Sequence, residues 1–149
     1  MRAIAAVCDK NGLQFTVVDS PHTVIEESDI EVPASRRDRG AQLGWLLEEA
    51  EALLQRLKPD VVYVKKAGSG KFAAAPERHE VEATVQIAAH HKGIRCVLRG
   101  TEQIRASHVP KAKGAYDELL RRPEIAARSN AAKRERYLYA LTALKDHGG

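Results

Sequence analysis

The sequence predicts an α/β fold built on a mixed five-stranded sheet, in which three antiparallel strands continue into βα units with flanking helices. Three observations carry this prediction: β-compatible runs fill the first 32 residues, a long amphipathic helical pattern follows, and short apolar runs then alternate with helical patterns. A chain of 149 residues suits one core, so we expect a single domain over residues 1–149.

The first segment predicts three strands in antiparallel series. Residues 2–8 and 13–19 flank an Asn11-Gly12 pair, which supplies the positive φ values of a tight hairpin turn. Residues 22–32 form a third β-compatible run that is interrupted by acids.

A helix of about 20 residues is expected next, because apolar residues recur at the helical period. These are Leu43, Leu46, Leu47, Ala50, Leu53, Leu54 and Leu57. Ser35 and Asp38 fit a variant of the capping box at its start, and Pro59 ends it.

The rest of the chain predicts two βα units and further helices. Residues 60–64 read as a buried parallel strand, residues 76–92 as a helix with Gly93 just past its end, and residues 94–98 as a fifth strand. Thr101 opens a short helix, and residues 130–146 predict a closing amphipathic helix.

Composition restricts the setting and the partners. The charged pair Asp9 and Lys10 interrupts the apolar start before a signal peptide can form, and no run approaches the roughly 18 apolar residues of a membrane span, so we expect a cytoplasmic protein without a membrane partner. Cys8 and Cys96 lie far apart in apolar runs, which favours buried free thiols over a disulfide or zinc site. Residues 95–136 carry 11 Lys and Arg against 5 Asp and Glu, and this excess attracts polyanions.

The element order is that of the ribonuclease H-like fold, and local residues narrow the resemblance. The stretch KPDVVYVKKAGSGKFAAAPERHEVEATVQIA resembles the part of RuvC-type Holliday-junction resolvases in which a hydrophobic strand leads to the active-site edge. It looks closer still to a family of uncharacterised bacterial RuvC-like proteins that share the GKFA segment and the EA-x-x-Q helix. The likeness covers most of residues 1–145 as topology and residues 61–105 as motif.

This resemblance implies a nuclease site in which carboxylates hold two divalent metal ions. The implied positions are the ends of the first and fourth strands and the last helix, which here hold Cys8 or Asp9, Lys65 or Lys66, and Glu135. Lys65 is the main departure, because the related proteins carry a glutamate at this strand end. A protonated amine about 4 Å from a divalent ion costs roughly 8 kcal/mol even at an effective dielectric constant of about 20.

An active enzyme would draw its catalytic acids from Asp9, Glu82 and Glu135, with Asp9 and Glu135 holding Mg²⁺ or Mn²⁺. Asp9 falls in the predicted turn, however, and a glutamate on a helix such as Glu82 is more often a solvated surface residue. We therefore expect a degraded or rearranged metal site, with no cofactor unless the protein is active.

The segment from Lys65 to Phe72 does not make a nucleotide-binding loop. A Walker A loop needs Ser or Thr after its Gly-Lys pair and a glycine five positions before that pair's glycine, whereas this chain has Phe72 and Lys65 there. Gly68 and Gly70 are explained as a strand-to-helix turn. A second interpretation of this segment is that basic residues at the carboxyl edge of the sheet also contact phosphates. The candidates are Lys65, Lys66, Lys71, Arg99, Arg105, Lys111 and Lys113.

Three functions fit the sequence. The first is a RuvC-like protein that binds DNA or RNA by structure and not by sequence, alone or as a homodimer or subunit of a larger assembly. The second is an active metal-dependent nuclease with an atypical acid set. The third is a protein-interaction subunit without a nucleic-acid role, in which the acidic residues 26–31 complement the basic sector between subunits.

Overall fold

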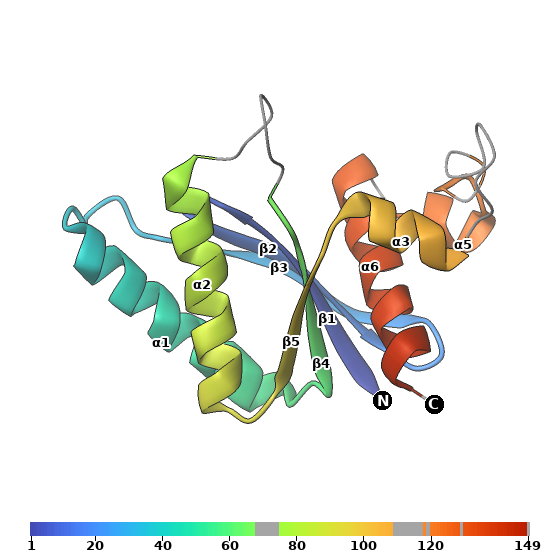
Figure 1. Cartoon of the computed structure of the whole chain (residues 1–149), viewed down its shortest axis with the longest axis horizontal. Coiled ribbons are helices and arrows are strands. Elements are labelled where there is room, and N and C mark those ends of the chain that lie inside the picture. The colour runs from blue at the N-terminus through green and yellow to red at the C-terminus, as the bar shows by residue number, and fades with distance from the viewer. Residues whose placement is uncertain (68–74, 109–117, 119, 129, 149) are drawn as a thin grey trace.

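The sheet has the predicted mixed topology. The computed structural model describes residues 1–67, 75–108, 118, 120–128 and 130–148, apart from the side chains of Arg105 and His108. Five strands pair in the order β3-β2-β1-β4-β5 (Figure 1). They are β1 (Arg2–Asp9), β2 (Gly12–Asp19), β3 (Thr23–Glu31), β4 (Val61–Lys65) and β5 (Arg95–Arg99). The first three pair antiparallel, whereas β4 is parallel to β1 and β5 is parallel to β4.

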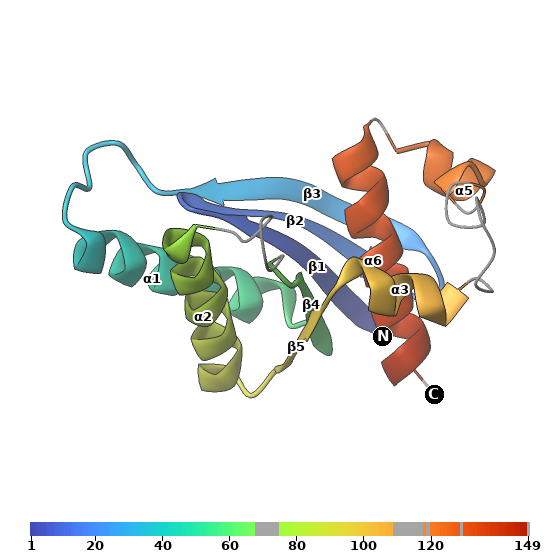
Figure 2. The same ribbon diagram turned by 45° about the horizontal axis from the view of Figure 1, so that its top comes forward.

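Helices cover both faces of this sheet. They are α1 (Arg39–Leu57), α2 (Pro76–His91), α3 (Thr101–His108), α5 (Pro123–Ala126) and α6 (Ala131–His147). Figures 1 and 2 show α1 and α2 on one face and α6 on the other, with α3 and α5 beside α6. None of the described helices is long and apolar enough to cross a bilayer.

The hydrophobic core has two parts, one on each face of the sheet. Side chains such as Phe15, Leu46 and Val64 pack between the sheet and the pair α1 and α2, whereas Tyr63 and Leu138 pack between the sheet and α6. Successive residues of a strand point to opposite faces. Lys65, which follows Val64 at the end of β4, therefore directs its side chain toward α6.

Local signals explain where the helices begin and end. Asp38 caps α1 by accepting a hydrogen bond from the Ala41 N–H at 2.9 Å, so the expected capping role of Ser35 is wrong. Arg36 precedes the helix and its carbonyl is held by the Gln42 side chain. Gly93, with φ of 68°, lies just past α2 as predicted, because glycine accepts this left-handed conformation without strain.

Two details differ from the sequence-based expectations. The short helix α5 was not predicted, and it buries Ile125, which is 2% exposed, against α6. Cys8 is the expected buried free thiol, whereas Cys96 is free but only half-buried, because β5 is the outer strand of the sheet.

Candidate functional site

The carboxyl ends of β4 and β5 bring three of the predicted basic residues together. Lys65 and Arg99 are the last residues of these parallel strands and are partners in the register. The Lys66 N–H donates to the Arg99 carbonyl at 2.9 Å, and the Lys66 side chain is exposed. In open α/β sheets, ligands bind outside the carboxyl ends of the strands. We call this region, including the adjoining starts of α2 and α6, the carboxyl edge.

Lys65 and Glu135 form an ion pair on the α6 side of the carboxyl edge. The Nζ of Lys65 donates to Oε1 of Glu135 at 2.7 Å, and the two side chains are 29% and 25% exposed. Glu135 lies near the start of α6, above the α6 face of the sheet. The carboxylate that the sequence assigned to a metal therefore already has a cation beside it.

The first strand contributes no carboxylate to this pair. Ala6 is level with Val64, so Val7 is the residue of β1 that is level with Lys65. Cys8 points into the opposite core, where burial, reinforced by the charge of Glu82, raises the pKa of its thiol to about 12. The Asp9 carboxylate accepts hydrogen bonds from the Asn11 N–H at 2.7 Å and from Gln14 Nε2 at 3.0 Å, so it stabilises the hairpin turn.

Glu82 lies on the other side of the sheet from Glu135. It is 3% exposed, so the expectation of a solvated surface residue is wrong. Within the described residues, its carboxylate lies 3.4 Å from Arg78 Nε and 3.7 Å from His79 Nδ1. The Arg78 contact is an ion pair without hydrogen-bond geometry, because neither Arg78 Nε nor Glu82 Oε1 has a hydrogen-bond partner within the described residues.

These donors do not fit a two-metal nuclease site. Within the described residues, no three His, Cys, Asp or Glu side chains gather closely enough to hold one metal ion. Asp9 was expected in the turn but is the last residue of β1, and its carboxylate is bound to the hairpin turn. Glu82 faces the opposite layer, and Glu135 is paired with an ammonium group. Within the described residues, the carboxyl edge therefore holds one ion pair and backbone hydrogen bonds, and it does not bring Asp9, Glu82 and Glu135 together.

Two arginines that were not among the predicted contacts lie in this region by their positions at the starts of α2 and α6. Arg78, in the first turn of α2, lies over the end of β4 with Nη2 3.4 Å from the Lys65 carbonyl. Arg134 precedes Glu135 on α6 and donates through Nε to the Arg128 carbonyl at 3.1 Å. Both positions had a signal in the sequence, since one opens the helix after the glycine segment and the other adjoins a predicted site residue.

The remaining predicted contacts are only partly described. Arg105 belongs to α3, which begins directly after β5, and its side chain lies outside the described residues. Lys71, Lys111 and Lys113 also lie outside them. Arg99 is held in place, with its guanidinium 5.6 Å from the centre of the Tyr63 ring.

Solved structures with the same architecture are known, although no family model matches the chain and no curated protein matches it. Among solved structures, RuvC of Thermus thermophilus in complex with a Holliday junction substrate superposes with a TM-score of 0.75 at 17% identity, covering 100% of this chain and 96% of that one. The protein has a RuvC-like fold.

A second Thermus thermophilus RuvC structure supports the same conclusion, with a TM-score of 0.73 at 15% identity over 99% of this chain and 97% of that one. The predicted ribonuclease H-like class is therefore confirmed. The likeness to the narrower group of bacterial RuvC-like proteins stays a prediction. At identities of 15–17%, the likeness shows the fold and assigns no role to individual residues.

Proposed function

We propose that the protein is a cytoplasmic RuvC-like protein that binds nucleic acid at the carboxyl edge through phosphate contacts and does not cut it by two-metal chemistry. The observation that carries this proposal is the Lys65–Glu135 ion pair at 2.7 Å. One of the similar solved structures is of RuvC with a Holliday junction substrate, so branched DNA is the first ligand to test.

Charge at the carboxyl edge supports phosphate binding. Lys65 neutralises Glu135, which leaves Lys66, Arg99 and Arg134 to attract a polyanion. Phosphate contacts depend on the shape of the nucleic-acid backbone and not on the base sequence, so recognition would be structure-specific. DNA and RNA remain alternatives, and a homodimer or larger assembly would extend the surface.

Binding can be measured by fluorescence anisotropy with a four-way junction, a duplex, a single strand and an RNA–DNA hybrid at about 50 mM salt with EDTA. We expect the logarithm of the binding constant to fall linearly with the logarithm of salt, by about one unit for each phosphate neutralised. Lys66→Glu should weaken binding and lower this slope. Lys92→Glu is the matched control, because it makes the same charge change at the opposite end of α2.

Two results would count against the proposal. The absence of binding to all four ligands at low salt would remove the nucleic-acid role and favour a protein-interaction subunit. Strong cleavage with Mg²⁺ or Mn²⁺ that is abolished by Asp9→Ala or Glu135→Ala would instead establish the active nuclease.

A further inference from the structure

The outer edge of β3 is open to pairing. β3 ends the strand order, and no described strand lies on its free side. The Val32 N–H donates to the Asn11 carbonyl at 2.8 Å, one residue beyond the Gly12–Glu31 pair. Since peptide groups alternate in an antiparallel ladder, Glu27, Asp29 and Glu31 direct their N–H and C=O groups away from β2.

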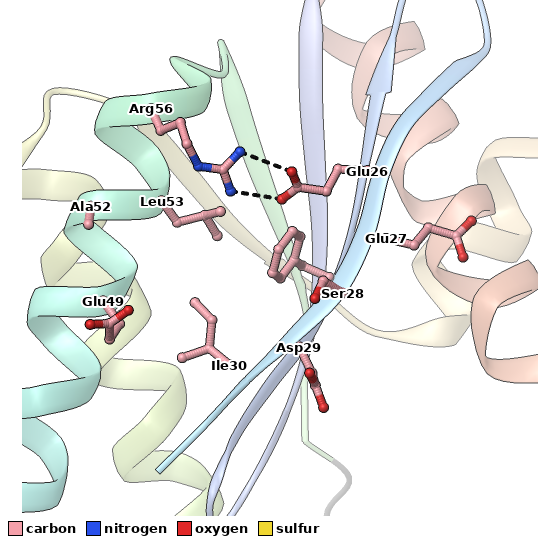
Figure 3. A pocket seen from close by; sticks show the side chains of 10 residues that line it. Glu26, Glu27, Ser28, Asp29, Ile30, Glu49, Ala52, Leu53 and Arg56 are labelled. Carbon is pink, nitrogen blue, oxygen red and sulfur yellow. Dashed lines mark hydrogen bonds and ion pairs between the residues drawn. The ribbon is translucent and has the colours of Figure 1, made fainter. Parts of the chain in front are cut away.

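A groove runs beside this edge on the α1 face. Its volume is about 570 Å³, and Figure 3 shows Ile30 and Ser28 on β3 facing Leu53 and Ala52 on α1. Phe15 from β2 also lines the groove. The groove therefore offers apolar contacts to side chains of a strand that pairs with β3.

Carboxylates dominate the edge. Arg56 donates to both oxygens of Glu26 at 2.9 Å, which holds the pKa of that carboxyl below its usual range. Glu27, on the opposite face, is 3.0 Å from Arg128. Asp29 and Glu31 have no ion pair or side-chain hydrogen bond within the described part of the chain.

We propose that β3 docks an extended, lysine- or arginine-rich segment of a partner protein as a sixth strand. Backbone bonds to Glu27, Asp29 and Glu31 would supply affinity, and alternate side chains would supply specificity. Apolar side chains would enter the groove beside Leu53, while cationic side chains would meet the unpaired carboxylates.

The edge charges select against other occupants. Acidic side chains on an edge strand repel strands of the same kind, so pairing between the β3 edges of two copies is disfavoured. The register shift between Val17 and Val18 interrupts the regular edge near the start of β3, which confines pairing to residues 26–31. A cationic partner strand satisfies both constraints.

The probe is a fluorescein-labelled peptide of nine alternating lysine and valine residues, the length of β3. We expect anisotropy to report saturable binding to the full chain, and Glu31→Lys to weaken it at least about fivefold by removing a complementary charge. Glu48→Lys, the same change at an exposed position of α1 outside the groove lining, should leave it unchanged.

Backbone pairing is tested separately from charge. A peptide of equal charge with proline at alternate valines cannot form the ladder, and we expect it to bind at least about tenfold more weakly. Asp29→Pro removes an outward N–H of β3 and should have a similar effect, with Asp29→Asn as its control.

Three outcomes would overturn the inference. They are no binding of the alternating peptide up to about 1 mM, equal binding of the proline peptide, and a dimer of the free protein that dissociates on Glu31→Lys, which would assign the edge to a second copy. Binding to nucleic acid, measured on the same variants, should not change, so failure here would leave the proposed function intact.

Discussion

Lys65 and Glu135 meet at 2.7 Å although they are 70 residues apart in the chain. Their contact joins the end of β4 to the start of α6, and both side chains are about three-quarters covered. A partly buried carboxylate is stabilised by a nearby positive charge. In this chain the amine supplies it.

A double-mutant cycle should show that the pair is energetically coupled. We expect Lys65→Met and Glu135→Gln to cost less together than the sum of their separate effects, with a coupling free energy of about 1 kcal/mol, since the pair is only partly shielded from water. Urea unfolding of the four proteins measures this. Lys66→Met, which alters an exposed neighbour, should show no coupling to Glu135→Gln. A coupling free energy of zero between Lys65→Met and Glu135→Gln would contradict the ion pair.

Replacing the amine should create a cation site. Lys65→Glu places a second carboxylate beside Glu135, and their mutual repulsion is relieved by a divalent ion. We expect Mn²⁺ to raise the Tm of Lys65→Glu and to leave the wild-type Tm unchanged.

The control for this experiment is Lys66→Glu, which makes the same charge change one residue along the chain. Addition of Glu135→Gln to Lys65→Glu should abolish the effect of Mn²⁺. An equal rise of Tm in the wild-type protein would mean that Lys65 does not exclude the metal.

The strand and helix order could be predicted from the sequence because each element carries its own period. The β1–β2 hairpin, the leucine pattern of α1 and the β-branched run of β4 follow from local signals, and the structure confirms these elements. The positive φ expected at Asn11 is wrong, because among the described non-glycine residues only Lys58 has one. The helix α5 was missed because Ile125 is buried only through contact with α6, which no local pattern in residues 121–130 indicates.

The candidate site was harder to predict because it depends on which face each side chain takes. Asp9, Glu82 and Glu135 were all plausible from their positions, yet one residue along a strand changes the face, and the sheet separates Glu82 from Glu135. Lys65 was identified as the departure, but its partner depends on how α6 packs, which the sequence does not encode locally.

Stability should fall in alkaline solution. Burial raises the pKa of Cys8 from 9.0 to about 12 and that of Cys96 to about 11, while burial and the bond to Asp146 raise the pKa of Tyr63 to about 12. The folded protein therefore holds these protons more tightly than the unfolded chain. The contribution is complete below about pH 9 and is lost as the pH rises from 9 toward 12, by up to about 1.4 kcal/mol per pH unit for each group.

Urea unfolding between pH 8 and 10 tests this, at about half-unit steps. Cys8→Ala should lower stability at pH 8, because it removes buried volume, but should make the decline above pH 9 shallower. A decline as steep as that of the wild-type protein would show that Cys8 does not titrate differently in the two states.

Tyr63 should anchor the end of α6 to the sheet. Its ring is fully buried, and its hydroxyl donates to Asp146 Oδ2 at 2.6 Å and lies 3.0 Å from His147 Nε2. We expect Tyr63→Phe to lower the free energy of unfolding by about 1–2 kcal/mol, because a bond to a charged acceptor is lost, and to speed amide exchange in residues 144–148. Tyr137→Phe, which removes a bond to the His22 carbonyl, should not speed exchange there. If both variants loosen the end of α6 equally, the effect is global, and the local role of Tyr63 is wrong.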